Sequence, residues 1–243
     1  MSCRSFRIIF KSWSWYTYSK IMDEIKNVKF WIFDLDNTLY PSSTNLFSRI
    51  DKLMANFITE HLNVNHEEAI QIKNDYFQKH GTTLNGLIKN HNVDPHHFLE
   101  FVHNIDYSFL NKNEKLNKEI KSLPGKKIIF TNGSRKHAKN VVNNLQLDEN
   151  LFSIFDIVDS DFVPKPERSP YEMLIKKYDI VPEQSIFFED IARNLKPAHD
   201  LGMKTGWVIN EDNWAKEGHD EDHVHFKIKE LDHFLEQCNL LIK

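Results

Sequence analysis

The sequence has few features that would point to a secreted, membrane-spanning or nucleic-acid-binding protein. It contains only two cysteines, Cys3 and Cys238, which form no CxxC pair, so we exclude a disulfide scaffold and expect the reducing cytoplasm. No uncharged apolar run is long enough to span a bilayer, so no membrane partner is expected. The formal net charge is −4, which gives no basic footprint for nucleic acid. The composition that is left, with 40% hydrophobic and 27% charged residues, is typical of a soluble globular protein.

The first 21 residues differ in composition from the rest of the chain. They carry four basic residues, no acidic residue, five serines and six aromatic side chains. Such a composition is found in transit peptides and in amphipathic segments that bind surfaces. The alternative is that the biological start is Met22, because the residues after it lead directly into the first predicted strand. We favour this alternative and expect residues 1–27 to be an extension that is disordered or not native.

Two aspartates follow the first apolar run of the sequence. Residues 28–33 are mostly β-branched or aromatic, which predicts a strand buried on both faces. Asp34 and Asp36 come directly after it, and side chains two residues apart share one face of an extended chain. Two converging carboxylates repel each other unless a cation lies beside them, and oxygen ligands suit magnesium. On this segment alone, an ordinary turn at the end of a strand is an equal alternative.

A long helical stretch follows this strand. Apolar residues recur at helical spacing from residue 46 onward, and nothing between residues 42 and about 111 is typical of a strand. We therefore predict that residues 42–112 form an all-helical cap, and that residues 28–41 and 113–243 form the α/β core. The histidines scattered through the cap segment lack a metal-ligand spacing, so we interpret them as surface or core residues.

Polar residues also end the later predicted strands. Thr131, Asn132 and Gly133 follow the strand at 126–130, and their turn opens a helix whose N-terminus suits an anion. Lys165 lies between two prolines, and Asp190 ends the strand at 184–190. Strands and helices alternate throughout this part of the chain. This predicts a doubly wound, Rossmann-like parallel sheet, with these residues at one edge.

Taken in order, these strand ends carry four motifs that resemble those of the haloacid dehalogenase superfamily of phosphatases. The motifs are Asp34-x-Asp36-x-Thr38, Thr131-Asn132-Gly133, Lys165-Pro166 and Glu189-Asp190, and the resemblance covers about residues 28–210. The chain is most similar to the pyrimidine 5′-nucleotidase branch. That similarity rests on FDLDNTLYP at 33–41, HGTTL at 80–84, IFTNG at 129–133 and FFEDIARNLKPA at 187–198.

The resemblance implies a mechanism and a set of site residues. Asp34 is expected to attack phosphorus and form an aspartyl-phosphate, while Asp36 acts as the general acid and base. Mg²⁺ is expected to be held by Asp34, the backbone carbonyl of Asp36, and Asp190. Lys165 would balance charge, and Thr131, Asn132 and Gly133 would bind phosphoryl oxygens. The cap residues Thr82 and Thr83 would contact the leaving group of a nucleoside monophosphate such as UMP or CMP.

Two positions depart from the family pattern. Glu189 stands where much of the superfamily has an aspartate, which leaves its role open, and His80 stands where an aromatic residue such as tyrosine is expected.

Three other functions are compatible with parts of this pattern. A dehalogenase is disfavoured because it needs no acid/base at position 36. A phosphatase of sugar phosphates or phosphoglycolate, and a non-catalytic phosphate-binding protein, remain as alternatives. The sequence does not predict an oligomeric state.

Overall fold

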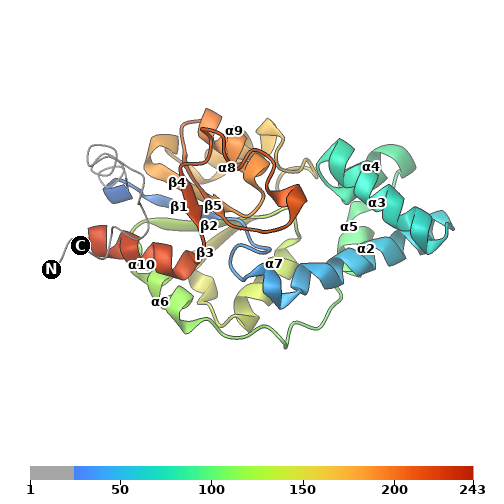
Figure 1. Ribbon diagram of the computed structural model, residues 1–243, viewed down its shortest axis with the longest axis horizontal. Helices are drawn as coiled ribbons and strands as arrows, with labels where there is room; N and C mark the ends of the chain where they lie inside the picture. Colours follow the sequence, from blue (N-terminus) through green and yellow to red (C-terminus); the bar gives the residue numbers. More distant parts are fainter. Residues whose placement is uncertain (1–24, 243) are drawn as a thin grey trace.

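The apolar segments between polar turns form one six-stranded parallel sheet in the computed structural model, which describes residues 25–242. The strands are β1 (Phe30–Phe33), β2 (Lys126–Phe130), β3 (Phe152–Phe155), β4 (Ser185–Glu189), β5 (Lys204–Val208) and β6 (Phe226–Ile228). Their spatial order is β3-β2-β1-β4-β5-β6, so the order reverses at β1 (Figure 1). The predicted doubly wound parallel sheet is confirmed, and β1 lies at the switch point where such sheets bind ligands.

The register of the sheet aligns the ends of its central strands. Phe33, the last residue of β1, pairs with Ile129 of β2 and with Phe188 of β4. All four residues of β1 are buried, as expected of a central parallel strand. The polar residues that follow these three strands therefore meet at one edge.

Two details of the sheet differ from the sequence prediction. The apolar residues at 154–158 predict a short strand there, whereas β3 begins at Phe152, and β6 is not predicted from the sequence. Strand β6 is a three-residue strand at the edge of the sheet whose middle residue, Lys227, is exposed. A three-residue segment with a lysine in the middle carries too little hydrophobic pattern to be identified as a strand from the sequence.

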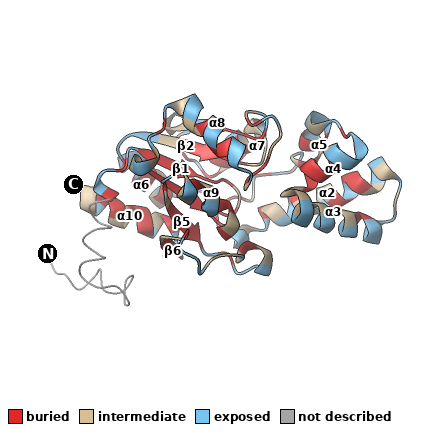
Figure 2. Ribbon diagram, turned by 90° about the horizontal axis from the view of Figure 1, so that it is seen from above, coloured by how far each residue is buried: buried red, intermediate tan, exposed pale blue. Residues whose placement is uncertain are grey.

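Helices cover both faces of the sheet. One face packs against α6 (Glu114–Ser122), α7 (Arg135–Asn144) and α10 (Leu231–Ile242), which share a single hydrophobic cluster with the strands. The other face packs against α8 (Arg168–Tyr178) and α9 (Leu195–Asp200) through a second cluster. The buried sides of these helices face the sheet, and their exposed sides face solvent (Figure 2).

Four helices between β1 and β2 form a separate layer beside the strand ends (Figure 1). They are α2 (Leu46–Leu62), α3 (His66–His80), α4 (Thr83–His91) and α5 (Pro95–Val102). Polar side chains begin three of them, since Asn65, Thr82 and Asp94 each accept a hydrogen bond from the first turn of the helix that follows. The four helices enclose their own hydrophobic cluster, in which Phe57 lies 5.1 Å from Phe98, centroid to centroid.

The N-terminal side of the core begins earlier than predicted. Ile25 is only 3% exposed and packs in the same cluster as β1, although the sequence analysis placed it in the extension. An apolar side chain next to the first strand is stabilised by burial, so the packed structure starts before residue 28. The predictions for residues 1–24 lie outside the described residues. Within residues 25–242, no helix has the length and apolar character needed to cross a membrane.

Candidate active site

Asp34 and Asp36 lie where β1 leaves the sheet. The backbone N–H of Asp34 still donates to Phe188 O at 2.8 Å, which extends the pairing of β1 with β4 by one residue. The Asp34 residue is 6% exposed, and its carboxylate opens into a cavity between the strand ends and the cap helices. The two aspartates thus occupy the position that the alternation of strands and helices predicts.

The ammonium group of Lys165 lies against the carboxylate of Asp34. The Lys165 residue is 1% exposed, and Nζ donates to Asp34 Oδ1 at 2.6 Å, Phe130 O at 2.9 Å and Glu189 Oε1 at 3.0 Å. These three acceptors match the three protons of an ammonium group. A phosphate oxygen that approaches Lys165 must therefore share a proton with one of them.

Asn132 positions the loop that carries Lys165. Its Oδ1 accepts from the backbone N–H of Lys165 at 2.9 Å, and its Nδ2 donates to Lys165 O at 3.4 Å. The Asn132 side chain, which the sequence analysis assigned to substrate, thus holds two segments of the site together. Thr131 and Gly133 line the cavity with it, and Thr131 Oγ1 accepts from Gly133 N at 2.9 Å.

Three carboxylates converge beside this lysine. Asp34, Glu189 and Asp190 are all buried, and each offers an oxygen within 4.8 Å of the others. Burial is the main reason why the pKa of Asp34 rises to about 7, with Lys165 opposing the rise and Glu189 and Asp36 adding to it. Burial and the charges of Glu189 and Asp34 likewise raise the pKa of Asp190 well above its usual range. Such a set of oxygen donors fits a divalent cation, whose charge would relieve this repulsion.

The two acidic residues at the end of β4 are held differently. Both oxygens of Glu189 accept hydrogen bonds within the protein, from Lys165 and Asn194 at Oε1 and from the backbone N–H of Ile191 at Oε2. Asp190 Oδ2 accepts from Asn210 Nδ2 at 2.7 Å. Both carboxylate oxygens of Glu189 are thus used in hydrogen bonds within the protein, whereas Asp190 has more oxygen lone pairs left to bind a metal ion.

The carboxylate of Asp36 is not part of this acidic cluster, whose members are Asp34, Glu189 and Asp190. Its Oδ1 accepts from Tyr40 Oη at 2.5 Å and lies 2.8 Å from Nε2 of His137. Burial would raise the pKa of Asp36, but the charge and hydrogen bond of His137, together with the Tyr40 hydrogen bond, bring it below its ordinary value. Any contact of Asp36 with a metal at the cluster is left to its backbone carbonyl.

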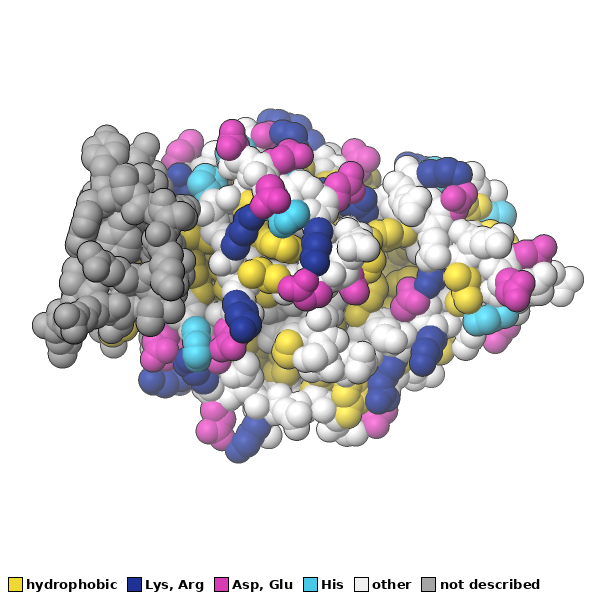
Figure 3. All heavy atoms as spheres, viewed as in Figure 1, with side chains coloured by type: hydrophobic (Ala, Val, Ile, Leu, Met, Phe, Trp, Pro, Cys, Tyr) yellow, Lys and Arg dark blue, Asp and Glu magenta, His cyan; other side chains and the backbone are white. Residues whose placement is uncertain are grey.

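The cavity beside these residues has a volume of about 610 Å³. In Figure 3, hydrophobic side chains gather around a hollow at the junction of the core and the cap helices. Its cap side includes the ion pair of Lys73 with Asp51, with 2.5 Å between Nζ and Oδ2. It also includes Phe77, whose ring packs edge-on against Trp214 at 5.7 Å.

Thr82 and Thr83 line this cavity, but their hydroxyl groups are used within the cap. Thr82 Oγ1 accepts from the backbone N–H of Asn85 at 3.1 Å, and Thr83 Oγ1 donates to Lys73 O at 3.2 Å. The aromatic residues that the sequence offers as stacking surfaces for a base are Tyr40, Tyr76 and Phe77. Of these, Phe77 lines the cavity, whereas Tyr40 is 2% exposed and bonded to Asp36, and Tyr76 is not among the lining residues.

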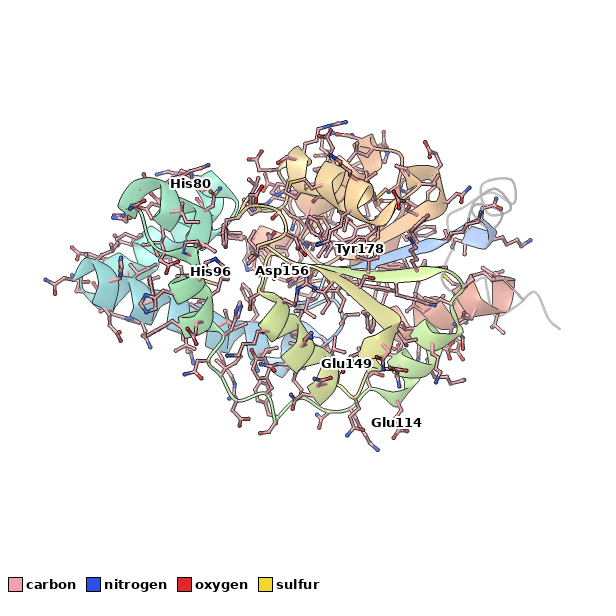
Figure 4. All side chains as sticks on the ribbon, turned by 180° about the vertical axis from the view of Figure 1, so that it is seen from behind. His80, His96, Glu114, Glu149, Asp156 and Tyr178 are labelled. Carbon is pink, nitrogen blue, oxygen red and sulfur yellow. The ribbon has the colours of Figure 1, made fainter. Side chains whose placement is uncertain are left out.

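Histidines contribute to the site in a way that the sequence analysis missed. His137 lies in the first turn of α7, after the Thr131–Ser134 turn, and its position three residues beyond the N-cap was the only available signal. The N-terminus of this helix is fixed by Asp156, which accepts from the backbone N–H of Arg135 at 2.7 Å. His80 and His96 lie on separate cap helices, α3 and α5 (Figure 4). Among the described residues, no histidine of the cap belongs to a group that could hold a metal.

Sequence comparison adds a family to this geometry. The profile described as haloacid dehalogenase-like hydrolase matches residues 31–208. Phosphate metabolism protein 8 of Saccharomyces cerevisiae is 28% identical over 209 residues, which cover 79% of this chain and 64% of the yeast protein. The chain therefore spans less than two thirds of the length of that relative.

Solved structures share the fold at low sequence identity. L-2-haloacid dehalogenase from Xanthobacter autotrophicus aligns with a TM-score of 0.54 at 15% identity, over 86% of this chain and 97% of its own. The HAD-hydrolase YfnB from Bacillus subtilis, bound to magnesium, aligns with a TM-score of 0.53 at 16% identity, over 87% and 99%. A HAD family hydrolase from Deinococcus radiodurans, with bound phosphate and sodium, aligns at 0.52 and 16%, over 88% and 98%.

Proposed function

The chain belongs to the haloacid dehalogenase-like hydrolase family, and from that premise we propose that it is a magnesium-dependent phosphomonoester hydrolase. The observation that carries the proposal is the pair of aspartates after β1. Asp34 contacts the buried ammonium of Lys165, while Asp36 is held separately by His137 and Tyr40. Transfer of a phosphoryl group to Asp34 requires a proton donor for the leaving oxygen, and Asp36 supplies that group. A dehalogenation reaction would need no general acid or base at the position of Asp36.

In the proposed reaction, a carboxylate oxygen of Asp34 attacks phosphorus and the bond from phosphorus to the leaving oxygen breaks. Asp36 gives its proton to that oxygen, then takes one from the water that cleaves the aspartyl-phosphate. The negative charge of a bound phosphate favours the protonated form of Asp36, because like charges nearby raise the pKa of a carboxyl group. Lys165 compensates the charge of both Asp34 and the phosphoryl group.

The acidic cluster fits a magnesium ion. Asp34, Asp190 and the backbone carbonyl of Asp36 would hold it, and Glu189, with both oxygens bonded inside the protein, would support the cluster from behind. The ion would reduce the repulsion between the anionic nucleophile and the anionic ester. Thr131 and the Asn132-Gly133 turn would then bind phosphoryl oxygens on the side of the phosphoryl group that does not face the magnesium ion.

We further propose that the leaving group is a pyrimidine nucleoside, as in UMP or CMP. The cavity pairs an aromatic surface, Phe77 with Trp214, with an ion pair that offers both a donor and an acceptor, Lys73 with Asp51. A pyrimidine base presents a flat face and an edge of carbonyl and nitrogen groups that such a cavity can match. The name of the yeast relative, a phosphate metabolism protein, is compatible with this role. We place the reaction in the cytoplasm, with a small phosphate ester as the partner.

The test is a metal-dependent phosphatase assay on the full chain. p-Nitrophenyl phosphate should be hydrolysed with Mg²⁺ and not with EDTA, and Asp34→Asn should abolish turnover while the fold, checked by circular dichroism, stays intact. Full activity in Asp34→Asn would exclude the covalent mechanism.

A substrate panel then tests the leaving group. UMP, CMP, AMP, GMP, a sugar phosphate and phosphoglycolate should be compared by kcat/KM. A preference for sugar phosphate or phosphoglycolate would replace the nucleotidase proposal. Phosphate binding without turnover of any ester would favour a non-catalytic binding protein.

A further inference from the structure

The carboxylate of Asp36 is held by one of its two oxygens only. Both neighbours described above, Tyr40 Oη and His137 Nε2, meet Oδ1. No hydrogen bond from the part of the chain that the structure describes reaches Oδ2, and the Asp36 side chain is 18% exposed and lines the cavity. Oδ2 is therefore the oxygen available to the substrate.

His137 is itself fixed on three sides. It is 0% exposed, its Nδ1 lies 2.9 Å from the hydroxyl of Tyr107, and its ring stacks on that of His103 at 4.3 Å between centroids. The Tyr107 hydroxyl also reaches His103 O at 3.1 Å, and Nδ1 of His103 lies 3.0 Å from Ser134 Oγ. A ring confined in this way cannot turn without breaking several contacts, so it gives Asp36 one orientation.

We propose that His137, together with Tyr40, is a positioning residue that directs Oδ2 of Asp36 at the leaving oxygen of the substrate. This inference rests on the proposed phosphatase function. In the first step the bond from Asp34 to phosphorus forms, the bond from phosphorus to the leaving oxygen breaks, and the proton on Oδ2 moves to that oxygen. In the second step water oxygen bonds to phosphorus, the bond to Asp34 breaks, and Oδ2 takes the proton of the water. The contacts at Oδ1 stay in place through both steps.

A purely structural histidine would behave differently from a positioning one. Loss of packing affects every substrate alike, because it lowers the amount or the order of the active protein. Loss of proton-donor alignment affects esters in proportion to how much their leaving group needs a proton. An alkoxide needs one, whereas p-nitrophenolate is stabilised by its own ring and departs with little help. The dependence of rate on leaving group therefore separates the two roles.

The experiment compares kcat/KM for p-nitrophenyl phosphate and for two alkyl esters, glycerol 2-phosphate and UMP, with Mg²⁺ in excess. kcat/KM reports the steps up to the first phosphoryl transfer, so hydrolysis of the aspartyl-phosphate does not mask the effect. In His137→Leu we expect a fall of about 10- to 100-fold on the alkyl esters. On p-nitrophenyl phosphate we expect a fall of less than about 3-fold. His137→Gln, which keeps an N–H donor, should recover part of the loss.

Two further variants complete the test. His223→Asn alters another buried histidine, which contacts Ala192 O outside the site, and should change the two ester classes equally. If His137→Leu does not fold, Tyr40→Phe tests the positioning role instead. It removes the other donor to Oδ1 of Asp36 and should likewise lower kcat/KM more for the alkyl esters than for p-nitrophenyl phosphate. Equal falls on both classes in the His137 and Tyr40 variants, with the native chain active, would overturn the positioning role alone. A native chain inactive on every ester would overturn the proposed function as well.

Discussion

Replacing Lys165 with methionine tests whether one buried cation holds the acidic cluster together. The change removes the charge and keeps a side chain of similar length. The ammonium is buried and lies 2.6 Å from Asp34 and 3.0 Å from Glu189. Removing one partner of a buried ion pair costs about 3–5 kcal/mol, because the remaining charges stay buried without compensation. Domains are stable by only about 5–15 kcal/mol, so this is a large share of the free energy of unfolding.

The loss should grow with pH. In the native protein the pKa of Asp34 is about 7, against an ordinary value of 3.8, even with Lys165 opposing the rise. A carboxyl group whose pKa is raised by folding contributes stability that is fully present below the unfolded pKa and is lost as pH rises through the folded one. Without Lys165 the pKa of Asp34 rises further. Above pH 7 the variant should therefore continue to lose stability after the native protein has levelled off.

The assay is urea unfolding of the full chain at pH 6, 7 and 8.5, with EDTA or with Mg²⁺. Lys165→Met should unfold at lower urea than the native chain, with the gap widest at pH 8.5. Mg²⁺ should narrow the gap, since a ligand that binds only the folded state stabilises it. Lys73→Met is the matched control, because Lys73 is also buried but pairs with the half-exposed Asp51 away from the cluster. Equal stability of Lys165→Met and native protein at every pH would refute the charge-compensation account.

Three further outcomes are expected. Asp36→Asn should lower kcat by about 10²–10⁴-fold, the range for a lost general acid and base, with an unchanged melting temperature as the check on folding. Gly125→Ala should lower the free energy of unfolding by more than about 2 kcal/mol in urea titrations, because φ is +73° and a Cβ would lie 2.1 Å from Lys29 O; an unchanged midpoint would contradict the β1–β2 geometry. UMP should exceed AMP in kcat/KM by about 10-fold or more, and Lys73→Met should reduce that ratio; equal values for purines and pyrimidines would remove the nucleotidase proposal.

The sequence was most informative where polar residues end apolar strands. Asp34, Thr131 and Asp190 could be placed at one edge because parallel strands joined by helices must align their carboxyl ends. The structure brings Asp34, Lys165 and Asp190 together within one buried network. Local sequence pattern and fold topology both place these residues at the same edge of the sheet, so their position could be predicted without knowledge of side-chain packing.

The sequence was least informative where a role depends on which way a side chain turns. Nothing in the pattern distinguishes a Tyr40 that stacks on substrate from one whose hydroxyl reaches Asp36. His137 is 101 residues away from Asp36 along the chain, and a single histidine in a helix carries no spacing signal. Thr82 and Thr83 line the cavity, but Thr82 caps α4 with its hydroxyl oxygen and Thr83 donates its hydroxyl proton to Lys73 O of α3. Such choices are settled by tertiary packing within the core and within the cap, which a local sequence pattern does not carry.

The order of the strands also has a consequence for how the chain is made. β1 is synthesised first, yet its neighbours are β2 and β4, and its register pairs Phe33 with Ile129 and Phe188. The contacts within the cap are between residues close in sequence, so the cap helices can fold before β2 and β4 pair with β1. Until β4 has left the ribosome, one edge of a fully apolar strand stays open, and exposed edges of this kind favour misassembly. Because Asp34 follows the central strand, the nascent chain that carries it passes through a long interval in which protection of β1 from other chains matters most.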